Sequence, residues 1–314
     1  MKQWYEPMEP VLIRRIREGE NYVHQIKWDG IRGIAVMEDR RVRIFNKSGR
    51  ERTGFYPETE SLADSVKAEK GVFDGELVVF DGLKPSFRKV LKRDQLKSTR
   101  YLDRYIKEYP VKYILFDILS LNGEDLRGKP WAERNEILRS SFTRNENIVI
   151  TDDFRDGKAL FAFTKQKGLE GIVTKDINSI YAKGKNHESW FKVKNEKSLL
   201  AVVCGVTLKQ GYPNALILGG YDQGKLVYIG NVATGLKESD KDFLFRNKEK
   251  LRQEESPFQE MASSPSSVWW FRPLLTCRVR FLEWTTDGVM RHPVLSGFSA
   301  SPAKEAVIEG EDLL

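Results

Sequence analysis

The sequence has few of the residues from which disulfide or zinc sites are built. Two cysteines, Cys204 and Cys277, and three scattered histidines occur among 314 residues, with no metal-ligand spacing between them. A disulfide framework or a structural zinc site needs several such ligands at short, regular intervals. We therefore expect a fold held together by its hydrophobic core, in a reducing cytosol.

Long hydrophobic runs are also missing. No apolar stretch approaches the roughly 18 to 20 residues needed to cross a bilayer. Residues 1–9 contain Trp, Glu and Pro where a signal sequence would have an apolar segment. These absences predict an intracellular protein with no membrane partner.

What is present suits a globular protein of two domains. The chain is 40% hydrophobic, which supplies core for both domains at this length. Its 52 Lys and Arg outnumber 45 Asp and Glu, giving a formal net charge of +7. A modest basic excess favours a polyanionic partner, such as nucleic acid, without requiring one.

The pattern of elements changes near residue 197. Before it, short strands over residues 22–45 predict an antiparallel meander, the apolar run 111–121 predicts a buried strand, and Pro130 predicts the start of a helix. After it come short, regularly spaced β segments with one helix near 239–251. We predict an α+β domain over residues 1–197, built on antiparallel sheet, and a small OB-type β-barrel over residues 198–314.

The sharpest local feature is Lys27-Trp28-Asp29-Gly30, in which a strand ends at a lysine and a glycine turns the chain. A lysine amine is a nucleophile only when it has lost its proton, so catalytic lysines need burial or nearby cations. Taken alone, this segment fits a charged hairpin at least as well.

Two acids lie beside apolar strands, and two lysines alternate along another. Glu76 and Glu170 would be unfavourable there unless paired or bound to a cation, and Mg²⁺ prefers oxygen ligands. Lys192 and Lys194 project to one face of their strand and could bind phosphate. Exposed strand-end acids and a solvated lysine face remain open alternatives, and Phe116 could be an ordinary core residue.

Five segments in order resemble the motifs of the covalent nucleotidyltransferases: KWDGIR (27–32), DGE (74–76), FD (116–117), EGIVTK (170–175) and WFKVK (190–194). That superfamily contains ATP-dependent DNA ligases, RNA ligases and mRNA capping enzymes. The segments YAKGK (181–185), EWTTDG (283–288) and RHP (291–293) are similar to those of small bacterial end-joining DNA ligases. The resemblance covers nearly the whole chain.

The resemblance implies an ATP-dependent DNA ligase with Lys27 as the nucleophile that forms a covalent lysyl-AMP. It implies that Glu76 and Glu170 hold Mg²⁺, or Mn²⁺ in its place. It assigns nucleotide binding to residues in or beside these motifs: Gln25, Ile26, Arg32, Lys47, Glu76, Phe116, Lys192 and Lys194.

The implied substrate is nicked duplex DNA, whose 5′-phosphate receives AMP before the neighbouring 3′-hydroxyl displaces it. A monomer in the bacterial cytosol, with a possible end-joining or repair recruitment factor, is expected with it. Two alternatives stay open. One is an RNA ligase or capping-type nucleotidyltransferase, and the other is a catalytically degenerate DNA-binding module.

Three departures from the family pattern bear on these expectations. Gln25 stands where DNA ligases often carry Glu for adenine, and Lys47 replaces a common arginine. Residues 297–302, Gly-Phe-Ser-Ala-Ser-Pro, stand where the family usually has Arg-x-Asp-Lys to orient the departing pyrophosphate. Formation of lysyl-AMP is therefore the step that the sequence supports least.

Overall fold

The computed structural model describes residues 4–143, 145–185, 187–259, 267–285 and 287–308. The chain divides into two compact units, Met1–Asn195 and Glu196–Leu314, where the sequence predicted domains over 1–197 and 198–314. Within the described ranges, no helix is both long and apolar enough to span a bilayer.

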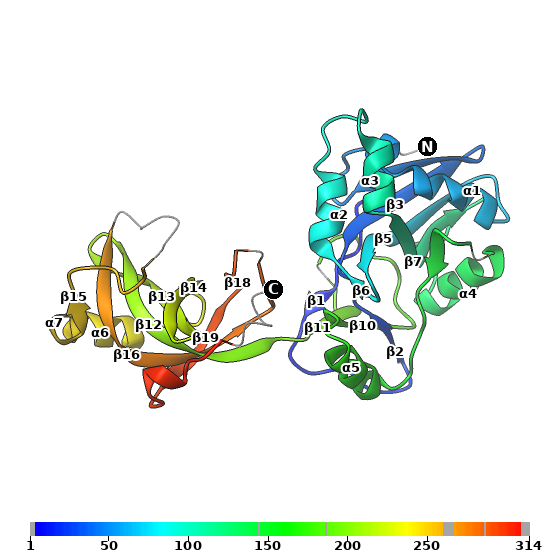
Figure 1. Ribbon diagram of the computed structural model, residues 1–314. Coiled ribbons are helices and arrows are strands. Elements are labelled where there is room, and N and C mark those ends of the chain that lie inside the picture. Colours follow the sequence, from blue (N-terminus) through cyan, green and yellow to red (C-terminus); the bar gives the residue numbers. More distant parts are fainter. Residues whose placement is uncertain (1–3, 144, 186, 260–266, 286, 309–314) are drawn as a thin grey trace. The chain divides into compact units, whose positions relative to one another are not determined.

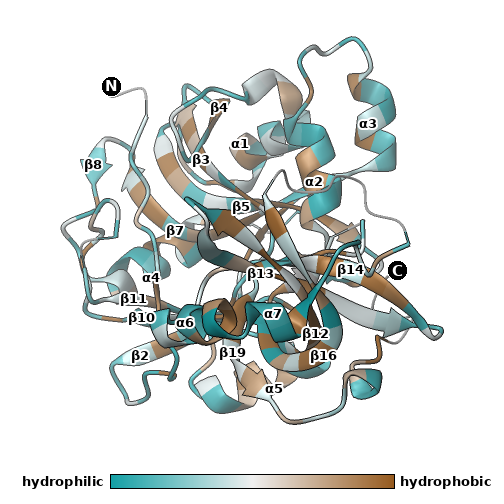
Figure 2. Cartoon of the chain, turned by 90° about the vertical axis from the view of Figure 1, so that its left-hand side faces the viewer, coloured by the Kyte–Doolittle hydropathy of each residue, from teal (hydrophilic) through white to brown (hydrophobic). Residues whose placement is uncertain are grey.

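The larger sheet of the first unit has the strand order β4-β3-β5-β7-β8, with β6 beside β5 and β9 beside β7. All its pairs are antiparallel except β7 with β9. The strands are β3 (Ile31–Glu38), β4 (Arg41–Asn46), β5 (Gly71–Asp81), β6 (Lys84–Pro85), β7 (Val111–Leu121), β8 (Glu124–Asp125) and β9 (Ile148–Ile150). The apolar run 111–121 is β7, in the interior of the sheet, so this prediction is confirmed; Figure 2 colours β7 largely hydrophobic.

A second, four-stranded sheet has the order β1-β11-β10-β2. Its strands come from the two ends of the unit: β1 (Val11–Leu12), β2 (Tyr22–Ile26), β10 (Gly171–Asp176) and β11 (Trp190–Lys194). Strand β10 pairs antiparallel with both β2 and β11, and β1 runs parallel to β11. Segments about 150 residues apart in the chain thus lie side by side (Figure 1).

The meander expected over residues 22–45 is wrong at its first turn. Strands β3 and β4 do form a hairpin, but β2 pairs with β10 and not with β3. Residues 27–30 therefore cross from one sheet to the other. A Cβ added at Gly30 would lie 2.4 Å from the carbonyl oxygen of Leu77, so glycine permits this crossing close against β5.

Helices cover the sheets of this unit. Two short 3-10 turns, η1 (Thr53–Phe55) and η2 (Pro57–Ser61), precede α1 (Leu62–Ser65), and the others are α2 (Phe87–Asp94), α3 (Leu102–Glu108), α4 (Trp131–Ser141) and α5 (Gly157–Gln166). Helix α4 begins directly after Pro130, as predicted, because proline lacks the N–H that a first helical turn leaves unpaired.

The second unit is a long antiparallel sheet of order β14-β13-β12-β16-β15, with β19 beside β16. Its elements are β12 (Lys197–Lys209), β13 (Tyr212–Asp222), β14 (Lys225–Val232), α6 (Glu238–Arg246), α7 (Lys248–Leu251), β15 (Arg252–Gln253), β16 (Val268–Phe281), β17 (Glu283–Trp284), β18 (Met290–Arg291), β19 (Val294–Ser299) and η3 (Ala303–Glu305). Cys204 and Cys277 are buried in it as free thiols.

Candidate active site

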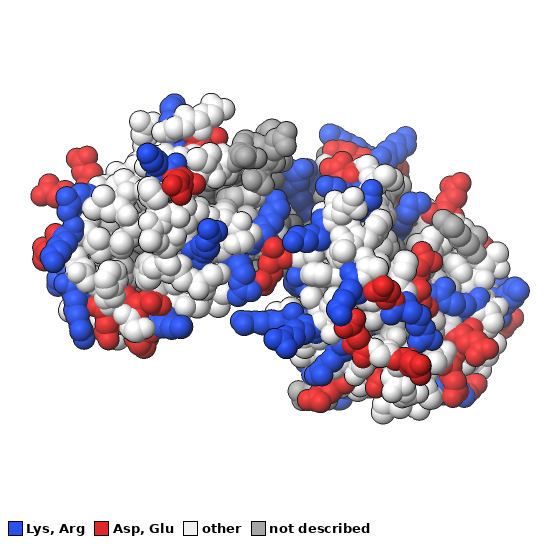
Figure 3. Space-filling model, turned by 90° about the horizontal axis from the view of Figure 1, so that it is seen from below, with Lys and Arg blue, Asp and Glu red and all other residues white. Residues whose placement is uncertain are grey.

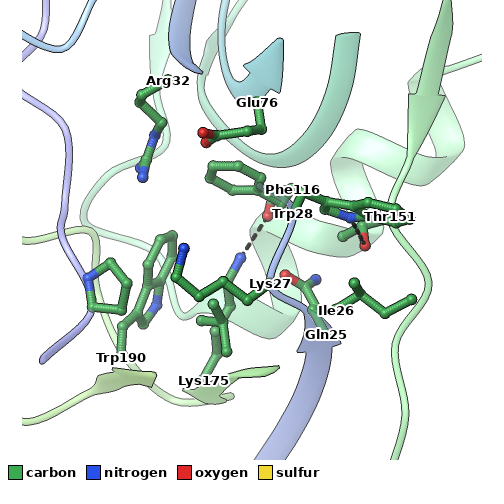
Figure 4. Close-up of a pocket in the computed structure, with 12 residues that line it drawn as sticks. Gln25, Ile26, Lys27, Trp28, Arg32, Glu76, Phe116, Thr151, Lys175 and Trp190 are labelled. Atoms are coloured by element: carbon green, nitrogen blue, oxygen red, sulfur yellow. Dashed lines mark hydrogen bonds between the residues drawn. The ribbon is translucent and has the colours of Figure 1, made fainter. Parts of the chain in front are cut away.

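A pocket in the first unit is lined by side chains from both of its sheets (Figure 4). Strands β2, β10 and β11 form one part of its wall and β3, β5 and β7 another, while Pro10, Lys27, Trp28 and Thr151 lie just outside the strands. The lining residues are Pro10, Gln25, Ile26, Lys27, Trp28, Arg32, Glu76, Phe116, Thr151, Val173, Lys175 and Trp190. Six of the residues predicted from the sequence are thereby brought together: Gln25, Ile26, Lys27, Arg32, Glu76 and Phe116.

Lys27 is fixed where the chain leaves β2. Its backbone N–H donates to the carbonyl oxygen of Gly171 at 2.9 Å, which extends the pairing of β2 with β10. Its Nζ atom lies 2.5 Å from Oε2 of Glu170, and Nζ of Lys194 lies 2.8 Å from Oε1 of the same carboxylate. Glu170 thus bridges the two lysines. Burial acts to raise the pKa of Glu170, but the two cations outweigh it, and the pKa is lowered.

Lys192 lies on the same strand face as Lys194. Burial, together with the positive charges of Lys27 and Lys194, lowers the pKa of Lys192 to about 8. Three lysines are therefore held near one another with one carboxylate between two of them. Such a concentration of positive charge is suited to a phosphate group.

Arg32 is held by an acid behind the pocket. Its guanidinium donates two hydrogen bonds to Asp74, each of 2.5 Å, and a third to the carbonyl oxygen of Met8 at 2.9 Å. Asp74 has no exposed surface and also accepts a hydrogen bond from the hydroxyl of Tyr181. This bidentate geometry fixes the plane of the guanidinium, which lies 4.6 Å from the ring centroid of Phe116.

Glu76 supplies a second carboxylate to the pocket. Burial raises its pKa to about 7, while the charges of Arg32 and Lys27 act in the opposite direction. Within the described residues, its side chain takes part in no hydrogen bond or ion pair. The carboxylate oxygens of Glu76 and Glu170 are of the type that Mg²⁺ prefers, and one or two such groups suffice when a nucleotide phosphate completes the coordination. The two residues therefore fit a magnesium ion, although no group of three protein ligands occurs in the described ranges.

Sequence reasoning missed Lys175 and Trp190 as lining residues. Lys175 has 1% of its surface exposed, donates to the carbonyl oxygen of Phe116 at 2.8 Å, and lies 4.0 Å from the ring centroid of Trp190. Burial lowers the pKa of Lys175 to about 7. The signal was available, because Lys175 ends the motif EGIVTK and Trp190 begins the motif WFKVK.

Four residues predicted from the sequence lie outside the lining. Glu170 and Lys192 adjoin the pocket through their interactions with Lys27, and Lys194 adjoins it through Glu170. Lys47 differs, since its exposed Nζ pairs with Glu9 at 2.7 Å. The structure therefore does not bring Lys47 to the pocket.

The segment that lacks the expected basic motif, residues 297–302, begins in β19 and continues into a turn. The hydroxyl of Thr276 donates to the carbonyl oxygens of Ser299 and Ser301, at 3.2 and 2.7 Å. The turn is thus held by the neutral hydroxyl of Thr276. Within the quoted segment 283–288, Thr286 lies outside the described residues.

Two family descriptions match the chain. The ATP dependent DNA ligase domain matches residues 9–194, and the ATP dependent DNA ligase C terminal region matches residues 209–300. The first of these contains every residue of the pocket. Together they confirm the predicted α+β nucleotidyltransferase fold followed by an OB-type domain.

Curated relatives of the chain indicate the same family. The multifunctional non-homologous end joining DNA repair protein LigD of Mycobacterium tuberculosis is 29% identical over 90% of this chain and 36% of that protein. LigD of Mycolicibacterium smegmatis is 30% identical over 93% and 38%. A DNA ligase of Sulfophobococcus zilligii is 31% identical over 76% and 44%. The chain thus spans less than half the length of these relatives.

Solved structures agree as well. The ligase domain of M. tuberculosis LigD matches 98% of this chain and all of that domain, at 26% identity and a TM-score of 0.54. A mycobacterial DNA ligase D complexed with ATP matches to the same extent, at 27% identity and a TM-score of 0.53. Motifs, fold and site lead to one conclusion: this chain belongs to the ATP-dependent DNA ligase family.

Proposed function

We propose that this chain seals nicks in duplex DNA with ATP, through AMP bound covalently to Lys27 and then to the DNA 5′-phosphate. The observation that carries the proposal is the position of the Lys27 amine. It lies in a pocket with Arg32, Glu76 and Phe116 and contacts Glu170 at 2.5 Å. An amine able to act as nucleophile, a carboxylate and cations suited to phosphate are thus held together.

In the first step the nitrogen of Lys27 would attack the α-phosphorus of ATP. A phosphorus–nitrogen bond forms, and the bond from phosphorus to the pyrophosphate oxygen breaks. The amine must first lose a proton, for which Oε2 of Glu170 is the nearest acceptor. Lys192 and Lys194 would neutralise the negative charge that develops on phosphate oxygens, because fixed cations in a partly buried site stabilise such charge.

Magnesium is expected with ATP, and Glu76 and Glu170 would hold it. When bound, the ion withdraws charge from the phosphate oxygens and favours departure of pyrophosphate. Arg32, fixed by Asp74, would position the ribose or phosphate, and Phe116 would stack on adenine. With these roles the base would lie between β7 and the strands β2 and β10.

The next two steps use DNA. The 5′-phosphate at a nick would attack the phosphorus of lysyl-AMP and displace Lys27, which leaves AMP joined to the DNA through a pyrophosphate bond. The 3′-hydroxyl would then attack the DNA phosphorus, and AMP would leave. In both steps the same cations face the reacting phosphates, so one site serves all three reactions.

Duplex DNA as the partner is supported by one concentration of charge. We call residues 82–109 the basic segment; it contains α2 and α3 and is visible in Figure 1. Nine Lys or Arg against three Asp or Glu give it a net charge of +6, close to the +7 of the whole chain. On the face drawn in Figure 3, by contrast, basic and acidic side chains are interspersed. Lys97 and Arg100 are exposed between the two helices, where phosphates could reach them.

A role in joining DNA breaks is a further part of the proposal, supported by the names of the LigD relatives. The recruitment factor, the monomeric state and the cytosolic location remain predictions.

The first experiment is incubation with α-labelled ATP and magnesium, followed by denaturation. The parent protein should retain label and Lys27→Ala should not. Lys129→Ala is a matched control, because this lysine lies outside the pocket and pairs with Glu124. If the parent carries no label, and mass measurement shows no AMP already bound, the ligase proposal fails and the DNA-binding alternative replaces it.

The other alternative is tested with the same protein. An RNA ligase or capping-type enzyme would seal nicked RNA in preference to nicked DNA, or would take label from GTP in preference to ATP. The proposal expects the opposite preference in both comparisons.

A further inference from the structure

The amide of Gln25 lies in the wall of the nucleotide pocket and is 2% exposed. Its Nε2 donates a hydrogen bond to Oδ1 of Asp153 at 2.7 Å. In the described part of the chain, its Oε1 accepts no hydrogen bond. Figure 4 shows this oxygen on the side of Lys27 and Lys175, while Nε2 lies on the other side.

Asp153 is itself held in place. Its other oxygen, Oδ2, accepts hydrogen bonds from Nδ2 of Asn135 and from Nη2 of Arg139, both at 2.7 Å. Arg139 also donates to the carbonyl oxygen of Thr151 at 2.8 Å, which ties it to the same wall. Both oxygens of Asp153 are thus engaged, and one of them faces Gln25.

This arrangement fixes the direction of the Gln25 amide. An ionised carboxylate only accepts hydrogen bonds, so it must face the NH₂ end of the amide and not the oxygen end. The two ends of a glutamine amide are nearly identical in shape, and their hydrogen-bond partners decide which way they point. With Nε2 engaged by Asp153, the oxygen is the end left for a ligand.

We infer that Asp153 is a positioning residue that makes the pocket selective for adenine, by holding Gln25 with its oxygen toward the nucleobase. Adenine carries an amino group at position 6, which donates a hydrogen bond. Guanine carries an oxygen there, which can only accept. An acceptor in the wall of the pocket therefore favours adenine. With guanine, the oxygen of Gln25 and the oxygen of the base would face each other, and neither would have a hydrogen-bond donor.

The inference accounts for the departure at residue 25. A glutamate there would present acceptor oxygens in either orientation, whereas glutamine has one donor end and one acceptor end. Gln25 can serve adenine only if a neighbour removes the ambiguity. Asp153 does so from a segment more than 120 residues away in the chain.

The decisive variants are Asp153→Asn, Gln25→Glu and the two combined. In Asp153→Asn the oxygen of the new amide would stay with the donors of Asn135 and Arg139, so its NH₂ would face Gln25 and turn the glutamine oxygen away from the base. In Gln25→Glu the new carboxylate and that of Asp153 would face each other and repel. In the double variant the introduced asparagine would donate from its NH₂ to the introduced glutamate, whose second oxygen would again face the base.

The measurement is covalent labelling by α-labelled ATP and by α-labelled GTP, with KM and maximal rate for each. Asp152→Asn is the matched control, because Asp152 is the adjacent residue and is exposed. We expect Asp153→Asn to lower the preference for ATP over GTP at least tenfold, mainly through a higher KM for ATP. We expect Asp152→Asn to keep the preference of the parent, and the double variant to recover it.

The outcomes separate this inference from the proposed function on which it rests. If neither nucleotide labels the parent, the proposed function fails. If ATP labels the parent selectively and folded Asp153→Asn keeps the same preference, the inference is overturned. If Asp153→Asn does not fold, the double variant is compared with Gln25→Glu. A double variant that is no more selective for ATP than Gln25→Glu also overturns the inference.

Discussion

The amine of Lys27 lies 2.5 Å from a carboxylate oxygen of Glu170, which places the proposed nucleophile in direct contact with a proton acceptor. Glu170→Gln keeps the size of the side chain but removes its charge, so it could neither take the proton nor balance Lys27 and Lys194. We expect single-turnover formation of lysyl-AMP to slow by about 100-fold, within the range for loss of a general base. Glu196→Gln, which alters an ion pair with Arg280 in the other unit, is the control; equal rates for both variants would remove Glu170 from the first step.

Replacement of Arg32 by lysine tests the pair of hydrogen bonds that Arg32 donates to Asp74. Lysine keeps the charge but cannot form two parallel hydrogen bonds, and it leaves a fully buried carboxylate partly unpaired. The free energy of unfolding should fall by about 2 to 4 kcal/mol in urea titrations. Arg40→Lys, in the exposed pair with Asp64, should change it by less than about 1 kcal/mol. Similar effects of the two variants would contradict the assignment.

Lys175 should make stability depend on pH. Its pKa of about 7 in the folded protein lies well below that of an unfolded lysine, so the unfolded chain binds more protons above pH 7. The contribution of Lys175 to stability is therefore lowest below pH 7 and rises as the pH increases. The free energy of unfolding of Lys175→Met, relative to that of the parent, should be highest at pH 6. This advantage should fall by about 2 to 3 kcal/mol between pH 6 and pH 9, as measured by urea unfolding. Parallel curves for the two proteins would show that Lys175 keeps one protonation state.

The basic segment should act on DNA and not on ATP. We expect Lys97→Ala combined with Arg100→Ala to weaken binding to nicked duplex. The slope of the logarithm of the binding constant against the logarithm of the salt concentration should become shallower, by the equivalent of about two phosphate contacts. Labelling by ATP should be unchanged. The exchange Lys97→Arg with Arg100→Lys keeps both charges and should bind as the parent does. Unaltered salt dependence in the alanine variant would exclude these side chains from the DNA interface.

Much of the local structure followed from the sequence, because local structure depends on neighbouring residues. The apolar run of β7 predicted a buried strand, and Pro130 predicted the start of α4. The motifs also selected six of the residues that line the pocket.

Contacts between distant segments did not follow from it. The pairing of β2 with β10 involves residues about 150 positions apart, and no alternation within residues 22–45 says which strand will be the neighbour. The same reason explains why Asp153 was not selected. It is a supporting residue only because the fold brings it to Gln25.

The order in which the chain is synthesised gives the four-stranded sheet a last consequence. Strands β1 and β2 leave the ribosome before their neighbours β11 and β10, which end only at residues 194 and 176. Until then Lys27 has neither Gly171 to hold its backbone nor Glu170 to contact its amine. If the proposed function holds, a nascent chain would not react with ATP until nearly all of the first unit has emerged, and covalent AMP on Lys27 would show that this unit has finished folding.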